Sequence, residues 1–253
     1  MKVLSRSALS RDVAEFLRSM PPAYAQSFSA RDIAEHAEIV SRRGELSAHA
    51  EPWRGRSSAS SYVCVVAEDR PGLLSFVTDA LLLHALNIQS AQIYCRLRED
   101  GTWEAIDFFC VEPVCASGEV ATVEPSELMS FAQTLRELIA EEQVVERKAS
   151  ERDTIPVPRP RPSRVYFDVD ALKRNELCLV VDTPDFSGLL FCISSALHGQ
   201  NARIMSSQIR TQDGVAHDRF QLAFCDDQPI TSERLCDAQQ AVWSALRAGS
   251  KGQ

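Results

Sequence analysis

Few residues of this chain have the types and spacings that enzyme chemistry needs. Nucleotidyl transfer uses a Gly-Ser turn followed by paired carboxylates that hold magnesium, and the sequence has no such arrangement. A metal-dependent phosphohydrolase gathers several histidines and aspartates, whereas this chain has one adjacent pair, His217-Asp218, and we interpret His217 as a half-exposed histidine of a strand. We therefore predict that the chain is not an enzyme and has no catalytic residue, no metal site and no other cofactor.

The eight cysteines also lack the spacing of a metal or redox site. No Cys-x-x-Cys motif occurs, and Cys110 and Cys115 flank a proline turn without a histidine at zinc spacing. Most of the cysteines lie inside apolar runs, which is typical of reduced, buried thiols in the cytosol. No apolar run approaches the ~20 residues of a membrane span, and the first residues do not resemble a signal peptide. We expect a cytoplasmic protein without a membrane partner.

Length and charge narrow the classes of partner. A chain of 253 residues with 45% hydrophobic and 25% charged residues is typical of one large or two small globular domains. Its formal net charge of −8 repels phosphate backbones. We therefore expect no direct binding of nucleic acid.

The elements that position the remaining polar residues are indicated by an internal repeat. Residues 63–93 align without a gap on residues 179–209. The aligned identities are Val65/Val181, Asp69/Asp185, Gly72/Gly188, Leu73/Leu189, Leu74/Leu190, Ala80/Ala196, Leu81/Leu197, Ile88/Ile204, Ser90/Ser206, Gln92/Gln208 and Ile93/Ile209. A repeat of this kind predicts two copies of one supersecondary unit.

Each copy predicts the same order of elements. In the first copy, the apolar run 62–67 predicts a strand, helical spacing follows Pro71, and two alternating segments around Asp100-Gly101 predict a hairpin. A second helix from Pro125 and a short strand at Val144-Val145 complete a βαββαβ unit, the ferredoxin-like arrangement of the α+β class. The second copy predicts strand, helix, strand, strand and helix at 177–181, 188–198, 203–211, 215–224 and 231–247.

The second copy has no final strand, because only six residues follow its last helix. Residues 164–170 alternate like a strand just before the copy, so we predict that they pair antiparallel with its first strand and fill the vacant edge. The segment 149–163 is interpreted as an extended spacer rich in proline and arginine. Since an isolated sheet of this kind leaves an open edge, the two copies should pair sheet to sheet or edge to edge, within one chain or across a dimer.

Residues 1–56 differ in kind and are interpreted as a helical extension and a linker. Two short amphipathic helices are expected, the first beginning at Ser10 and the second at Ser29. They should pack on the repeats, because two short helices bury little surface alone. The run from Arg43 onward has the composition of a loose linker with Trp53 as its one anchor.

The residues DRPGLLSFVTDALLLHALNIQSAQI, followed by the Asp-Gly hairpin and Asp107, resemble an ACT domain, a small-molecule-sensing module of amino-acid metabolism. The resemblance covers residues 60–148 well and residues 176–248 moderately. It implies one ACT domain at 60–148 and a second at 164–248, which includes the strand before the second copy. The segments FLRSMPPAYAQSFSARDIAEHAEIV and RVYFDVD further resemble the carboxy-terminal regulatory region of the bifunctional PII uridylyltransferase/uridylyl-removing enzymes. The catalytic parts of that family have no counterpart in these residues.

The resemblance implies a ligand site at the loop between the first strand and first helix, together with the start of the second strand. In the first copy these positions are Asp69, Arg70, Pro71, Gly72, Leu73, Leu74, Asn87 and Ile88. The physics fits an amino acid, because a helix start favours a carboxylate, glycine permits close approach and an aspartate can offset an ammonium group. The alternative is that Asp69 only caps the helix and Gly72 only permits packing.

The second copy departs from this pattern and is expected to give a weaker site. Its corresponding residues are Asp185, Phe186, Ser187, Gly188 and Leu189, with Asn201 as a substitute for the missing asparagine or as a helix-ending residue. Position 203 is arginine where the first copy has Asn87. His84 and His198, near the ends of the equivalent helices, are interpreted as complements of the helix dipole.

We expect a regulatory protein that binds a small amino acid, with glutamine the first candidate by resemblance, and that forms a homodimer through its ACT domains. One alternative is a protein-interaction or transcriptional regulator whose ACT folds bind no ligand. Another is a detached regulatory arm that acts in trans on a separate PII uridylyltransferase. Each of these roles implies a regulated protein partner.

Overall fold

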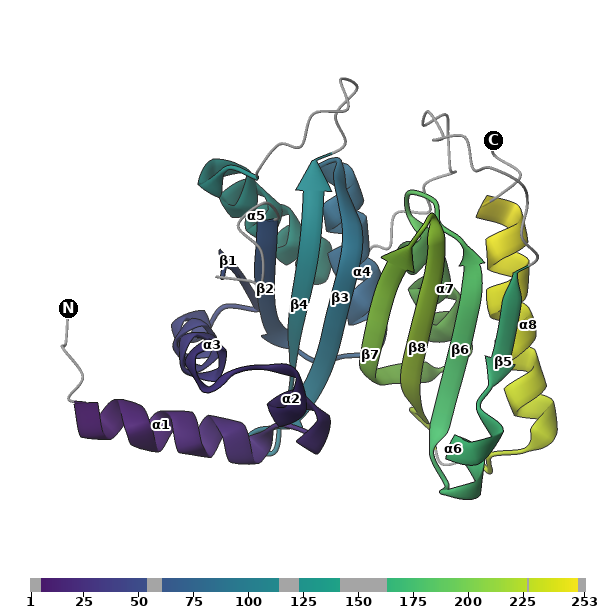
Figure 1. Cartoon of the computed structure of the whole chain (residues 1–253), viewed down its shortest axis with the longest axis horizontal. Coiled ribbons are helices and arrows are strands. Elements are labelled where there is room, and N and C mark those ends of the chain that lie inside the picture. Colours follow the sequence, from purple (N-terminus) through teal and green to yellow (C-terminus); the bar gives the residue numbers. More distant parts are fainter. Residues whose placement is uncertain (1–5, 54–60, 114–122, 142–162, 227, 250–253) are drawn as a thin grey trace.

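The chain forms one continuous antiparallel sheet with helices on both faces. The structure, a computed structural model, describes residues 6–53, 61–113, 123–141, 163–226 and 228–249. Its eight strands follow the spatial order β1-β2-β4-β3-β7-β8-β6-β5. Figure 1 shows the two halves of this sheet side by side, joined at β3 and β7.

The first repeat copy and the extension before it form one half of the sheet. The helical extension consists of α1 (Arg6–Ser19), α2 (Pro22–Ser27) and α3 (Ala30–Arg43). The remaining elements of this half are β1 (Ala48–Pro52), β2 (Ser61–Glu68), α4 (Leu73–Leu83), β3 (Leu86–Leu97), β4 (Trp103–Pro113) and α5 (Pro125–Glu141). The predicted order of strand, helix, strand, strand and helix is present, whereas the predicted strand at Val144-Val145 lies outside the described residues.

The second copy repeats this order. Its elements are β5 (Arg164–Phe167), α6 (Val169–Lys173), β6 (Leu177–Pro184), α7 (Leu189–Gly199), β7 (Ala202–Gln212), β8 (Val215–Phe224) and α8 (Ser232–Gly249). The prediction that a preceding segment fills the vacant edge is confirmed, because β5 pairs antiparallel with β6 in the register Val165 to Val181. The strand is shorter than predicted. It ends at Phe167, because the Asp168 carboxylate accepts hydrogen bonds from the N–H groups of Asp170 and Ala171 and thereby caps α6.

Three expectations for the extension are corrected or confirmed by the structure. The linker interpretation is wrong for Ala48–Pro52, which form β1 and pair antiparallel with the edge of β2. These residues lack the β-branched side chains that favour strands, so the pairing is set by the neighbouring edge and not by local propensity. The helix α1 begins at Arg6, earlier than Ser10. Ser29 does cap α3, in a reciprocal capping box with Asp32.

The pairing of β3 with β7 relates the two copies by an approximate twofold axis. Gln92 lies opposite Gln208, and these two residues are equivalent in the repeat. The prediction that the copies pair is confirmed in its edge-to-edge form, within one chain. Beside this junction α4 packs against α7, where the Ser75 hydroxyl donates to the Ser194 hydroxyl at 3.3 Å.

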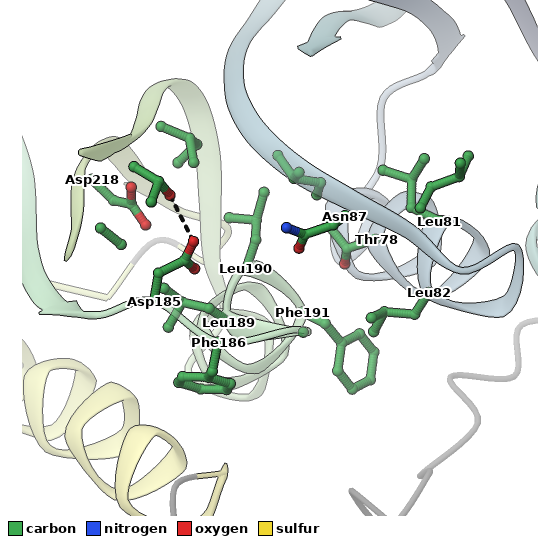
Figure 2. A pocket seen from close by; sticks show the side chains of 16 residues that line it. Thr78, Leu81, Leu82, Asn87, Asp185, Phe186, Leu189, Leu190, Phe191 and Asp218 are labelled. Atoms are coloured by element: carbon green, nitrogen blue, oxygen red, sulfur yellow. Dashed lines mark hydrogen bonds between the residues drawn. The ribbon is translucent and has the colours of Figure 1, made fainter. Parts of the chain in front are cut away.

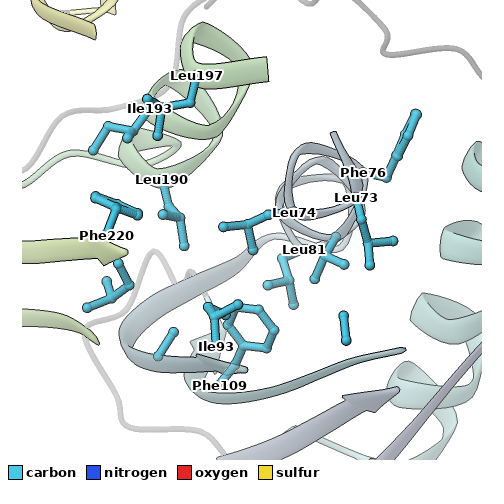
Figure 3. Packing of buried hydrophobic residues seen from close by; sticks show 14 of the residues in the cluster. Leu73, Leu74, Phe76, Leu81, Ile93, Phe109, Leu190, Ile193, Leu197 and Phe220 are labelled. Atoms are coloured by element: carbon cyan, nitrogen blue, oxygen red, sulfur yellow. The ribbon is translucent and has the colours of Figure 1, made fainter. Parts of the chain in front are cut away.

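One hydrophobic core runs through both copies on the face that carries α4, α5, α7 and α8. Figure 3 shows how Leu74 of α4 and Leu190 of α7, equivalent residues of the repeat, lie between the two helices. The helix start of each copy packs against the helix end of the other, with Gly72 beside His198 and Gly188 beside Leu82.

A second core lies on the opposite face of the first half, beneath α1–α3. Its central side chain is Tyr24, whose hydroxyl lies 2.7 Å from Nδ1 of the buried His36. Burial lowers the pKa of His36 to about 3, so the imidazole is neutral at physiological pH. The expectation that the short helices pack on the repeats is confirmed. None of the helices in the described ranges is long and apolar enough to span a membrane.

Candidate functional site

Two pockets lie at the junction of the copies, one on each side of the approximate twofold axis. We name each after the aspartate of its strand-helix loop. The Asp185 pocket combines this loop and the start of α7 with the end of α4 and the start of β3. The Asp69 pocket combines the loop of the first copy and the start of α4 with the end of α7 and the start of β7. Each pocket therefore needs both copies.

The Asp185 pocket is shown in Figure 2. Its lining residues are Thr78, Leu81, Leu82, Leu86, Asn87, Ile88, Asp185, Phe186, Gly188, Leu189, Leu190, Phe191, Ile209, Thr211, Ala216 and Asp218. The Asn87 side chain extends from the first copy toward Leu190 of the second (Figure 2). Apolar walls with a few polar groups are typical of small-molecule sites.

The Asp69 pocket is built from the equivalent positions. Its lining residues are Asp69, Arg70, Gly72, Leu73, Leu74, Ser75, Ile93, Cys95, Ala105, Asp107, Ser194, His198, Ala202, Arg203 and Ile204. In the repeat Arg203 stands for Asn87 and His198 for Leu82. Asp107 and Asp218 are also equivalent, because they lie opposite Val65 and Val181 in the neighbouring strands.

The structure divides the first predicted set of site residues between the two pockets. Asp69, Arg70, Gly72, Leu73 and Leu74 line the Asp69 pocket, whereas Asn87 and Ile88 line the Asp185 pocket. The antiparallel pairing of β3 with β7 causes this exchange, because it places the first residues of each of these strands beside the helix start of the other copy. Pro71 is not among the lining residues of either pocket.

The residues predicted for the weaker site of the second copy lie together in one pocket to a greater extent than those of the first set. Asp185, Phe186, Gly188 and Leu189 all line the Asp185 pocket, but Ser187 and Asn201 line neither pocket. Asn201 has a left-handed φ of 55° and donates its N–H to the carbonyl of His198 at 2.9 Å. This geometry gives it the helix-ending role of the two alternatives.

The backbone at both helix starts requires glycine. Gly188 and Gly72 precede α7 and α4 with φ of 88° and 80°, in the left-handed region. A Cβ added at Gly188 would lie 3.4 Å from Leu82, and one at Gly72 would lie 3.1 Å from the His198 ring. Each glycine therefore permits close approach of the other copy's helix as well as the turn itself.

In the Asp69 pocket the aspartate already has a cationic partner. Nε of Arg203 donates to Oδ2 of Asp69 at 2.8 Å, and Nη2 donates to the same oxygen. The guanidinium carbon of Arg203 also lies 5.0 Å from the centre of the Trp103 ring. Arg70, the other arginine of this pocket, donates to the carbonyl of Ile139 at the end of α5.

In the Asp185 pocket two carboxyl groups lie without a basic side chain among the lining residues. Asp185 accepts a hydrogen bond from the Thr211 hydroxyl at 2.9 Å, drawn dashed in Figure 2, and burial raises its pKa. Asp218 is 1% exposed, and burial raises its pKa to about 8. Its Oδ1 accepts the N–H of Arg210, but its buried Oδ2 has no hydrogen-bond partner within the described residues.

Sequence reasoning did not identify Thr211 and Asp218 as pocket residues. One sequence offset aligns the first three elements of the two copies, but it does not align the hairpins that follow. The turn is longer in the first copy, where Trp103 of β4 pairs with Leu97, than in the second, where Val215 of β8 pairs with Gln212. An alignment with a gap at this turn would have matched Asp107 with Asp218. It would have indicated a second acidic position in both copies.

No family model matches the chain. Two curated proteins are similar to most of it, and both carry the name bifunctional uridylyltransferase/uridylyl-removing enzyme. The protein of Rhodospirillum rubrum is 28% identical over 234 residues, which are 89% of this chain and 24% of that protein. The protein of Cereibacter sphaeroides is 25% identical over 210 residues, which are 82% of this chain and 22% of that protein. The chain thus spans about a quarter of the length of the curated relatives it matches, and it is distantly similar to one region of these enzymes.

Proposed function

We propose that this chain is a non-catalytic regulatory unit in which two ACT-type copies bind one free amino acid in the Asp185 pocket. Glutamine is the first candidate, and the unit would act in nitrogen metabolism. The observation that carries the proposal is that Asp185 and Gly188 of the second copy line one pocket together with Asn87 of the first copy, which is far from them in the sequence.

The chemistry of this pocket suits both ends of an amino acid. The first N–H groups of a helix have no acceptor within the helix and favour a carboxylate, and Gly188 lets the backbone at the start of α7 come close. Asp185 can hold the ammonium group. The Asn87 amide can both donate and accept, which suits a side-chain amide such as that of glutamine. Leu82 and Leu190 supply apolar walls.

Two further observations support a regulatory role. Each copy has the order strand, helix, strand, strand and helix, which an ACT-type unit requires. The chain is also similar to a region of two enzymes whose printed names describe uridylyl transfer and removal, and that region covers less than a quarter of their length. We infer that the matched region regulates such activity.

The sequence favoured the first copy's loop, but we place the ligand in the Asp185 pocket. The reason is the ion pair between Arg203 and Asp69, which occupies the polar end of the Asp69 pocket. The Asp185 pocket has Asn87 at the equivalent position.

The proposal is tested by a thermal-shift screen of the whole chain against each protein amino acid, followed by calorimetry. We expect one amino acid to raise the Tm and to bind in the calorimeter. Replacing Asp185 by Asn removes a charged hydrogen bond to the ligand, worth about 1.5–3 kcal/mol, so binding should weaken by about 10- to 150-fold.

Asp182→Asn is the matched control, because Asp182 lies on β6 just before the loop that carries Asp185 and accepts a hydrogen bond from His217 outside the pocket. It should bind as the wild type does. If none of the amino acids binds, the proposal fails, and the rival in which the ACT folds contact only proteins gains support. Copurification of the chain with a separate uridylyltransferase would identify the third alternative, the regulatory arm that acts in trans.

A further inference from the structure

The two pockets differ in whether a positively charged side chain of the protein lies beside the loop aspartate. Asp69 and Asp185 are equivalent residues, and the Asp69 side chain is 5% exposed against the guanidinium of Arg203. At the place of Arg203 the Asp185 pocket has the neutral Asn87, and its lining residues include no lysine, arginine or histidine. One pocket thus contains a cation of the chain itself, and the other does not.

We propose that Arg203 is a built-in occupant of the Asp69 pocket, and that its guanidinium takes the place that a ligand's cationic group takes in the Asp185 pocket. The molecule would then have two related pockets, of which only the Asp185 pocket is open to a ligand. The identity of the ligand rests on the function proposed above, but the role of Arg203 in the Asp69 pocket does not.

Arg203 contacts the kinds of groups that would hold a bound cationic ligand. Two of its nitrogens donate to one carboxylate oxygen of Asp69, its guanidinium lies against the Trp103 ring, and its side chain is 20% exposed. A planar guanidinium pairs with a carboxylate and an aromatic ring at once, which a neutral asparagine cannot do. His198 narrows the same pocket, because its ring lies at the Gly72 backbone where the other pocket has Leu82.

A second buried carboxyl group in each pocket offers a further hydrogen-bonding position to a ligand. Asp218 lines the Asp185 pocket, and Asp107 lines the Asp69 pocket at the equivalent position. Each has one carboxyl oxygen that is buried without a hydrogen-bond partner in the part of the chain that the structure describes. The ligand of the Asp185 pocket should therefore present its ammonium or guanidinium group toward Asp185 and a hydrogen-bonding group toward the unpartnered oxygen of Asp218.

The first test copies Asn87 into the other pocket by the substitution Arg203→Asn. Calorimetry with the amino acid that binds the wild type should give one ligand per wild-type chain and two per variant chain. The variant Arg219→Ala is the matched control, because Arg219 also pairs with a single aspartate, Asp168, but lines neither pocket. It should keep one ligand per chain. A stoichiometry of one in Arg203→Asn would overturn the proposal.

The second test needs no amino acid and uses methylguanidinium, a fragment of the arginine side chain. Removal of the side chain in Arg203→Ala leaves the Asp69 carboxylate without its cation, so millimolar methylguanidinium should raise the Tm of this variant. It should not raise the Tm of the wild type or of Arg219→Ala. If Arg203→Ala does not fold, methylguanidinium should restore its folding, as followed by circular dichroism.

The two tests separate this proposal from the proposed function. Rescue by methylguanidinium without any amino-acid binding would support the role of Arg203 and contradict the amino-acid site. Amino-acid binding by the wild type without rescue and without a second site in Arg203→Asn would contradict the role of Arg203 and leave the proposed function standing.

Discussion

At the scale of single residues, the two pockets differ at a few equivalent positions. Position 87 is asparagine and its equivalent 203 is arginine, and this one difference decides whether a loop aspartate already has a cation. The aspartates and glycines at the helix starts are shared. The two pockets therefore share the same backbone arrangement, and the residues in which the copies differ determine what each pocket can bind.

Asp218 should make the stability of the fold depend on pH. Its pKa is about 8 in the folded chain, because burial and the nearby Asp185 and Asp182 oppose its charge while the N–H of Arg210 favours it, and 3.8 is its ordinary value. Between these two values the folded state binds more protons than the unfolded state, so the free energy of unfolding falls as pH rises, by up to about 1.4 kcal/mol per pH unit.

Asp218→Asn removes this dependence. Urea denaturation at several values from pH 5 to pH 8 should show the variant gaining stability relative to the wild type as pH rises. Asp237→Asn, a substitution at an exposed position of α8, should leave the slope unchanged. A constant difference between Asp218→Asn and the wild type across this range would show that the buried carboxyl group is not protonated in the fold.

At the scale of elements, both ends of the sheet are completed by a strand that precedes its copy. β1 pairs antiparallel with β2, and β5 pairs antiparallel with β6. The sequence predicted β5, because residues 164–170 alternate like a strand and the second copy lacks a final strand. It did not predict β1, whose Ala48 and Ala50 lack strand propensity, so that strand is formed by the edge it joins. The two short strands limit the open edges of the sheet.

Tyr166→Pro tests the role of β5 in the second copy. Asp168 donates its N–H to Cys178 of β6, and hydrogen bonding alternates along an antiparallel pair, so the N–H of Tyr166 should also face β6. Proline removes that bond at a cost of about 1 kcal/mol or more. Hydrogen exchange of β6 and β8 should accelerate, with little change in β2 and β4.

Tyr166→Ala is the control, because it keeps the N–H and removes a side chain that is 43% exposed. Exchange in this variant should stay close to that of the wild type. Equal protection of β6 in the proline and alanine variants would contradict the account of the edge strand.

At the scale of the whole molecule, the site exists because two copies pair through β3 and β7. The repeat showed which residues are equivalent, and it predicted most of the elements and the pocket-forming loops. It did not show that Asn87 and Ile88 lie beside the other copy's loop, because that depends on how the copies pair and not on either copy alone. Asp218 was missed because the hairpins of the two copies differ in length. For a site that lies between two copies, the sequence indicates the residues that each copy contributes but not which of them meet.

The most direct test of an amino-acid site that straddles the copies is hydrogen exchange measured by mass spectrometry, with and without the amino acid that the screen identifies. We predict that the ligand slows exchange in two segments from different copies: residues 81–88, from the end of α4 to the start of β3, and residues 185–191, at the start of α7. Residues 69–75, at the Asp69 pocket, should exchange as before, because Arg203 already occupies it. Protection confined to one copy, or centred on residues 69–75, would contradict the account.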